Sequence, residues 1–192
     1  ALITNQSGVD QTGKRTVDLL REQGVQIEYL FAPEHGLSGK MLAGDAVHDE
    51  IDAATGIPVI SLYGGDKKGH EFNVNLSLNK IDTFIFDIQD SGMRHYTYIS
   101  TMYLTMELAL KNNKQMVVLD RPNPLGVIME GPVTDPDQIH FIAISPIPLR
   151  HAMTVGELAL YFNKYHYDNI NLFFIKCLVV GGLPSRFITN NL

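Results

Sequence analysis

The tetrad PEHG places an acid and an imidazole, Glu34 and His35, between a proline and a glycine directly after an apolar run. Proline restricts one backbone torsion and glycine permits a tight exit, so we expect the Glu34 carboxylate to be held rigidly. A rigid carboxylate suits general acid or base catalysis, with His35 as a neighbour that positions or tunes it. The alternative is a structural ion pair between Glu34 and Arg94 or Arg121.

Polar residues also follow three other apolar runs, in TNQSG, FDIQDSGMRHYTY and DRPNP, and a second acid–glycine–proline sequence occurs in MEGP. The candidate site residues in these segments are Asn5, Asp87, Gln89, Asp90, Arg94, Tyr96, Tyr98, Asp120, Arg121, Asn123 and Glu130. Each acid or amide taken singly is equally well explained as a cap of a helix or turn. The tyrosines offer hydroxyl groups and ring faces to a sugar, although such residues near a helix start more often pack in a core. Four clusters together favour a ligand site.

Asp87 differs from the other acids because its position predicts a structural role. Alternation along a strand places Phe84, Phe86 and Ile88 on one face and Asp87 on the other. A partly buried carboxylate needs a partner, so we expect Asp87 to form an ion pair. The expected partners are Arg94, His95 and Arg121.

Apolar runs that suit strands alternate with segments that suit helices. The expected strands cover residues 1–5, 25–31, 57–63, 81–88, 115–120 and 171–180, and the expected helices cover 13–23, 98–112 and 154–163. The last helix has Thr154 as N-cap and Glu157 as its capping-box partner. Several runs are short, β-branched and not cleanly alternating, which favours strands buried on both faces and an α/β fold with a mostly parallel sheet. Ligands of such sheets bind at the carboxyl ends of the strands, so the four clusters are expected to share one rim.

Composition narrows the possible partners. The chain has 192 residues with 45% hydrophobic content, which suits one compact domain. We expect this domain over residues 1–180, with 181–192 as a tail or as the start of a truncated C-terminal region. Its net charge of -6, with scattered charges, argues against a nucleic acid partner. No apolar run reaches the ~20 residues of a membrane span, and the single cysteine, Cys177, excludes an internal disulfide. The oligomeric state cannot be read from the sequence.

Motifs for cofactor and nucleophile chemistry are absent from the sequence. The first turn, TNQSGVDQTGK, matches neither GxGxxG nor GxxxxGK[ST], and there is no GxSxG. Histidines and acids lack compact metal-ligand spacing. The nearest metal-ligand candidates are His35, Asp45 and His48, with His70, His95 and His151 in reserve. We therefore predict no metal and no other cofactor.

Eight motifs occur along the chain in a fixed order: LITNQSGVD, LFAPEHGLSG, AGDAVHDE, TGIPVISLYG, FDIQDSGMRHYTYISTM, VVLDRPNPLG, EGPV and IPLRHAMTVGELA. In this order they resemble a bacterial family of exo-β-N-acetylmuramidases, which was formerly listed as a domain of unknown function. The resemblance implies a Rossmann-like catalytic domain with helices on both faces, joined in the family to a smaller C-terminal domain that is not recognisable past about Cys177. It also implies removal of N-acetylmuramic acid from the non-reducing ends of peptidoglycan fragments outside the cytoplasm, without metal or nucleotide. The family's cleft glutamate falls on Glu34.

Glycoside hydrolysis ordinarily uses two carboxyl groups, about 5 Å apart in retaining enzymes and roughly 6.5–9.5 Å apart in inverting ones. Glu34 is the expected acid or nucleophile, and its partner stays open among Asp90, Asp120 and Glu130. Arg94 or Arg121 is expected to bind the lactyl carboxylate of muramic acid. The main alternative is a non-catalytic module that binds a sugar or muropeptide, and a weaker one is an esterase or deacetylase.

Overall fold

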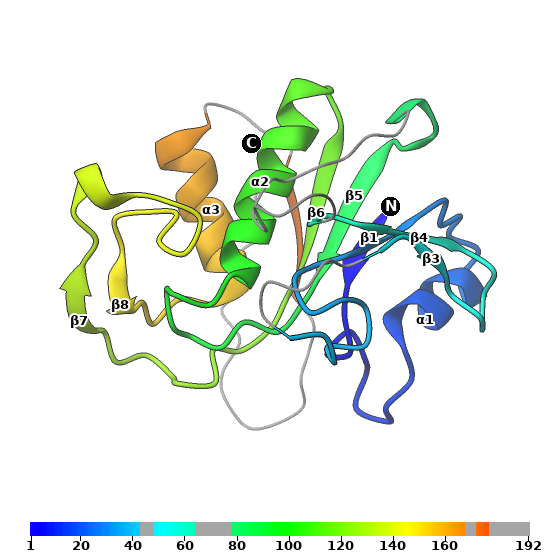
Figure 1. Ribbon diagram of the computed structural model, residues 1–192, viewed down its shortest axis with the longest axis horizontal. Coiled ribbons are helices and arrows are strands. Elements are labelled where there is room, and N and C mark those ends of the chain that lie inside the picture. Colours follow the sequence, from blue (N-terminus) through cyan, green and yellow to red (C-terminus); the bar gives the residue numbers. More distant parts are fainter. Residues whose placement is uncertain (43–47, 64–77, 168–171, 177–192) are drawn as a thin grey trace.

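A computed structural model describes residues 1–42, 48–63, 78–167 and 172–176. They form a seven-stranded sheet of order β3-β4-β2-β1-β5-β6-β9 (Figure 1). The parallel strands are β1 (Leu2–Thr4), β2 (Leu30–Ala32), β4 (Pro58–Ser61), β5 (Thr83–Asp87), β6 (Gln115–Asp120) and β9 (Leu172–Lys176), and β3 (Glu50–Ile51) pairs antiparallel at the edge. Without β3, this is the Rossmann order 3-2-1-4-5-6.

Helices cover both faces of this sheet, as the α/β prediction requires. α1 (Thr16–Glu22) lies on one face, and α2 (Tyr98–Lys111) and α3 (Val155–His166) lie on the other (Figure 1). Strand alternation explains the two layers, because successive side chains along β1 enter different cores: Leu2 contacts the α1 side and Ile3 the α2 side. The predicted Rossmann-like fold is confirmed.

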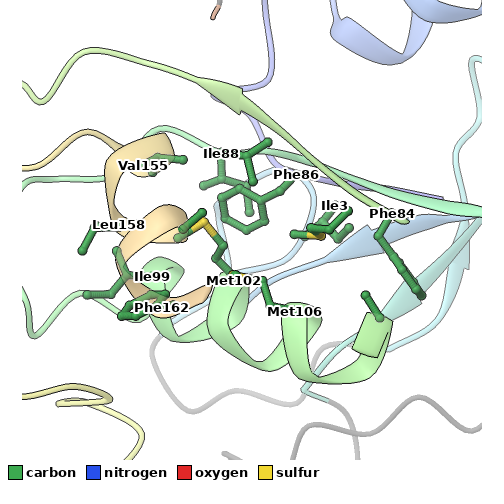
Figure 2. Packing of buried hydrophobic residues seen from close by; sticks show 14 of the residues in the cluster. Ile3, Phe84, Phe86, Ile88, Ile99, Met102, Met106, Val155, Leu158 and Phe162 are labelled. Carbon is green, nitrogen blue, oxygen red and sulfur yellow. The ribbon is translucent and has the colours of Figure 1, made fainter. Parts of the chain in front are cut away.

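The larger core lies between the sheet and α2 and α3. In Figure 2, Phe84, Phe86 and Ile88 from the sheet face apolar side chains of both helices. The helical side chains labelled there are Ile99, Met102, Met106, Val155, Leu158 and Phe162. Because all three sheet residues are fully buried on this side, the predicted alternation around Asp87 is confirmed.

Predicted and observed elements agree best where caps are strong. Thr154 accepts a hydrogen bond from the Glu157 backbone and Glu157 returns one, so the predicted capping box is confirmed. α1 begins at Thr16 rather than 13, because the Asp10 carboxylate first closes a turn by accepting the backbone N–H of Lys14. β2 is only three residues long, and the expected strand residues 177–180 lie outside the described part of the chain.

A small antiparallel pair, β7 (Glu130–Val133) and β8 (Pro148–Arg150), lies apart from the main sheet (Figure 1). Two 3₁₀ turns cover Leu78–Lys80 and Pro136–Gln138. The sequence pattern did not predict this pair, because β7 is exposed along its whole length and carries no apolar alternation. No helix in the described ranges has the length and apolar character needed to cross a bilayer.

Candidate functional site

The four predicted clusters do share one rim of the sheet. β1 pairs in parallel with β2 and β5, and β5 pairs in parallel with β6, so their carboxyl ends meet at the lower edge of the view in Figure 1. The strand order reverses between β1 and β5, where Thr4 is paired with Asp87. Such a switch point is where open α/β sheets bind ligands.

Glu34 lies at this rim in the turn after β2 and is 9% exposed. Its Oε2 accepts a 2.6 Å hydrogen bond from the Thr97 hydroxyl, at the N-cap of α2. Arg94 and Arg121 donate to other acceptors, so the ion-pair alternative for Glu34 is wrong. The carboxylate is held by a neutral hydroxyl and is not neutralised by either arginine.

The turn that carries Glu34 has an unusual backbone. His35 adopts φ 72°, in the left-handed region that non-glycine residues rarely enter, and Gly36 follows at φ 75°. The ring atom Nδ1 of His35 lies 2.8 Å from the Met41 carbonyl oxygen. A carbonyl oxygen only accepts, so His35 Nδ1 carries a hydrogen and donates it to Met41. His35 therefore stabilises the turn that presents Glu34.

Two tyrosines, Tyr63 and Tyr98, lie close enough to Glu34 for its charge to raise their pKa values. Burial raises the pKa of Tyr98, the nearby side-chain amides of Asn5 and Gln6 lower it in part, and the Glu34 charge raises it further. Burial likewise raises the pKa of Tyr63, whose hydroxyl lies 2.7 Å from Thr101 Oγ1. Both phenols are therefore neutral groups beside Glu34 near neutral pH.

Asn5 connects the loops on either side of the switch point. Its Oδ1 accepts bonds from the Ser7 backbone and hydroxyl, and the Ser7 hydroxyl in turn accepts the backbone N–H of Gln89. Asn5 Nδ2 is buried and reaches no acceptor at hydrogen-bond geometry, although the amide is near enough to Tyr98 to lower its pKa. Gln6 packs on the Glu34 turn, because a Cβ on Gly39 would lie 2.3 Å from its side chain.

Asp87 forms the predicted ion pair, and Arg121 is its partner. Arg121 donates from Nε at 2.9 Å and from NH2 at 2.7 Å to Asp87 Oδ1, and it also donates to the Val9 carbonyl. Asp87 is fully buried. The predicted ion pair of Asp87 is confirmed. Arg121 also links β5 to the loop after β1 through the Val9 carbonyl.

Asp90 pairs with a histidine far away in the sequence. Its Oδ2 accepts the backbone N–H of Gly92 at 2.7 Å and lies 3.1 Å from His151 Nε2. Both side chains are buried, at 4% and 2% exposure. Asp90 Oδ1 is also buried and has no hydrogen-bond partner in the described part of the structure. Asp90 is thus a buried rim carboxylate with one oxygen, Oδ2, held by two donors and the other, Oδ1, held by none in the described residues.

Asp120 is used to cap α3. Its Oδ1 accepts the Gly156 backbone N–H at 2.7 Å, and its Oδ2 accepts the Thr154 hydroxyl at 3.0 Å. Asn123 bridges nearby, donating to the Met153 carbonyl. Both oxygens of Asp120 are therefore engaged, as the capping interpretation of strand-end acids predicts.

The remaining candidates are bound to the protein or exposed. Arg94 donates to the carbonyls of Pro132 and Ile147, and Gln89 donates to those of Asp90 and Pro122. Glu130 pairs with Arg150 on the β7–β8 pair, and Tyr96 is half exposed. Arg94 and Arg121 both donate to protein acceptors, and binding of a lactyl carboxylate by either stays a prediction.

Two cavities open on the α1 side of the rim. One of about 400 Å³ is lined by Asn5, Gln6, Leu37 and Ser38 near the Glu34 turn, with Val17 and Leu30 deeper in the core. Another of about 800 Å³ extends along α1 past Gln89 and Arg121. Both volumes fall in the range of small-molecule sites. In the described residues, no three histidine, cysteine or acid side chains are grouped as for a metal, and Asp45 and His70 lie outside them.

Sequence reasoning missed several residues of this rim. Thr97, Gln6, Ser7 and Tyr63 were not singled out, and His151 was considered only as a metal ligand. Tyr63 follows β4, so the rule that polar residues at strand ends share a rim identifies it. Thr97 and His151 contact acids more than 60 residues away, which no local pattern reveals.

Comparisons with known proteins agree with this arrangement. The model of the family "Exo-beta-N-acetylmuramidase NamZ, N-terminal" matches residues 1–179. Peptidoglycan beta-N-acetylmuramidase NamZ of Bacillus subtilis (strain 168) is 46% identical over 177 residues, which cover 91% of this chain and 42% of that protein. The chain therefore spans less than half the length of this curated relative.

Solved structures show the same fold. A DUF1343 family protein of Bacteroides fragilis NCTC 9343 superposes with a TM-score of 0.78 at 42% identity, over 91% of this chain and 44% of that one. A second DUF1343 family protein from the same organism superposes with a TM-score of 0.76 at 32% identity, over 93% and 46%.

Proposed function

The chain belongs to the family of NamZ exo-β-N-acetylmuramidase N-terminal domains, and on this premise we propose that the full-length protein is a glycoside hydrolase. Its substrate is a peptidoglycan fragment, from whose non-reducing end it releases N-acetylmuramic acid. The observation that carries the proposal is Glu34, a nearly buried carboxylate held at the switch-point rim by Thr97.

Glu34 is the proposed general acid. It gives its proton to the glycosidic oxygen as the bond from that oxygen to the anomeric carbon breaks, and water supplies the hydroxyl group of the released sugar. The surroundings suit this role, because the Thr97 hydroxyl holds the carboxylate, two neutral tyrosines lie nearby, and Arg94 and Arg121 donate to other acceptors.

Asp90 is the proposed second carboxylate. Of the three open candidates, Asp120 has both oxygens engaged at the start of α3, and Glu130 is exposed in an ion pair on the β7–β8 pair. Of the three, Asp90 combines burial at the rim with one carboxylate oxygen that no protein group in the described residues binds. A carboxyl separation of roughly 5 Å corresponds to retention and roughly 6.5–9.5 Å to inversion.

The test is Glu34→Gln in the full-length protein, assayed with a chromogenic N-acetylmuramide. Loss of a positioned acid is expected to lower kcat by about 10²–10⁴-fold. Glu107→Gln is the matched control, because Glu107 is paired with Lys111 on the surface of α2 and is expected to leave turnover unchanged. Near-normal turnover of Glu34→Gln excludes the acid role, and saturable binding by a wild-type protein without turnover favours a sugar-binding module.

A further inference from the structure

We propose that His151 is a positioning residue that holds Asp90 in its active orientation. The inference rests on the proposed function, in which Asp90 is the second carboxylate. His151 follows β8, 61 residues from Asp90 in the sequence, and its Nε2 lies 3.1 Å from Asp90 Oδ2. Both side chains are excluded from solvent. Such a buried pair has one geometry, because water cannot replace either partner.

Hydrogen bonding settles which nitrogen of His151 carries the proton. The backbone N–H of Met153 donates to His151 Nδ1 at 3.2 Å, so Nδ1 is an acceptor and cannot carry a hydrogen. The neutral ring therefore carries its hydrogen on Nε2 and donates it to Asp90. The same oxygen, Asp90 Oδ2, accepts a second hydrogen bond from the backbone N–H of Gly92 at 2.7 Å, so two donors fix its position.

The backbone around this pair is constrained in a way that supports a positioning role. Ala152, directly after His151, adopts φ 61°, which is costly for a residue with a Cβ. Gly92 adopts φ 85°, and a Cβ there would stand 2.4 Å from Asn123 Oδ1. Two uncommon conformations thus bring the donors of His151 and Gly92 to the same oxygen, Oδ2. Asp90 Oδ1 accepts no hydrogen bond in the described part of the structure.

The experiment compares His151→Phe with His151→Gln in the full-length protein. Phenylalanine keeps the ring volume and removes the donor, whereas the terminal amide of glutamine places an N–H near the position of Nε2. We expect His151→Phe to lower kcat about 10²-fold with KM little changed, and His151→Gln to recover most of that loss. His166→Phe is the matched control, because His166 contacts Ser145 at the far end of α3 from the rim, and it is expected to keep wild-type kcat.

Three results overturn the inference. They are an unchanged kcat in His151→Phe, a glutamine variant no better than the phenylalanine variant, and a drop in melting temperature that accounts for all lost activity. A wild-type protein that hydrolyses no muramide contradicts the proposed function instead. In that case a crystal structure of His151→Phe still decides the inference: an Asp90 carboxylate that leaves its rotamer supports positioning by His151, and an unmoved one refutes it.

Discussion

Replacing Arg121 with methionine distinguishes a structural cation from a substrate-binding one. Methionine keeps much of the side-chain volume but removes every hydrogen bond to Asp87 and to the Val9 carbonyl. Asp87 is fully buried and its Oδ2 already lacks a partner, so the substitution leaves a buried charge without compensation. We expect a large loss of folding stability.

The size of this loss follows from the burial of the pair. The Arg121 side chain is 12% exposed and that of Asp87 is 0% exposed, so solvent screens their attraction weakly. Breaking a buried ion pair by removing one partner costs about 3–5 kcal/mol of the free energy of unfolding. A typical domain has only about 5–15 kcal/mol in total. Replacing both residues, as Asp87→Leu with Arg121→Met, removes the stranded charge and is expected to recover much of the loss.

Urea denaturation followed by circular dichroism measures this loss, and steady-state kinetics on a muramide measures any effect on binding. The structural interpretation predicts a lower urea midpoint for Arg121→Met and a higher one for the double variant. The opposite result is a wild-type midpoint with a KM raised more than tenfold. That outcome refutes the structural interpretation and indicates that Arg121 binds the substrate.

Two further predictions concern other rim residues. Asp120→Ala removes two hydrogen bonds at the start of α3, those from Thr154 and Gly156. We expect this variant to lower the free energy of unfolding by about 1–2 kcal/mol and to leave kcat/KM unchanged. A loss of kcat at unchanged stability contradicts the capping role. Burial and the Glu34 charge raise the pKa of Tyr98, so its contribution to folding stability is fully present below about pH 10 and falls at higher pH. We expect Glu34→Gln to lower the pKa of Tyr98 in a titration of phenolate absorbance. An unchanged titration shows that the Glu34 charge is remote from Tyr98.

Local pattern was enough to predict the parallel strands, the helices and the rim, but not the short, exposed edge strand β3. Apolar runs identify buried strands whatever their partners, and the capping box at Thr154 is confined to four residues. Parallel pairing then places every strand end at one edge, which is why Glu34, Asp90 and Asp120 were expected together. β7 escaped prediction because its EGPV sequence is exposed and has no apolar period.

The role of each rim acid could not be predicted in the same way, because it depends on contacts between distant segments. Asp90 meets His151 across 61 residues, Glu34 meets Thr97 across 63, and Asp87 meets Arg121 across 34. Before folding, the three acids have similar local surroundings, each just after an apolar run. Their different partners, a histidine, a hydroxyl and a guanidinium, are set only when the strands pair.

The crevice of this Rossmann fold has also been adapted away from phosphate binding. A dinucleotide needs a glycine-rich turn whose N–H groups and helix start are open to the pyrophosphate. Here the loop after β1 folds back on itself through a bridge between Val9 and Arg15, and Arg15 binds Asp52. Glu34 and Asp90 place two carboxylates at the same rim, where negative charge disfavours a phosphate group. In the proposed function these acids act on a glycosidic bond, which carries no charge for them to repel.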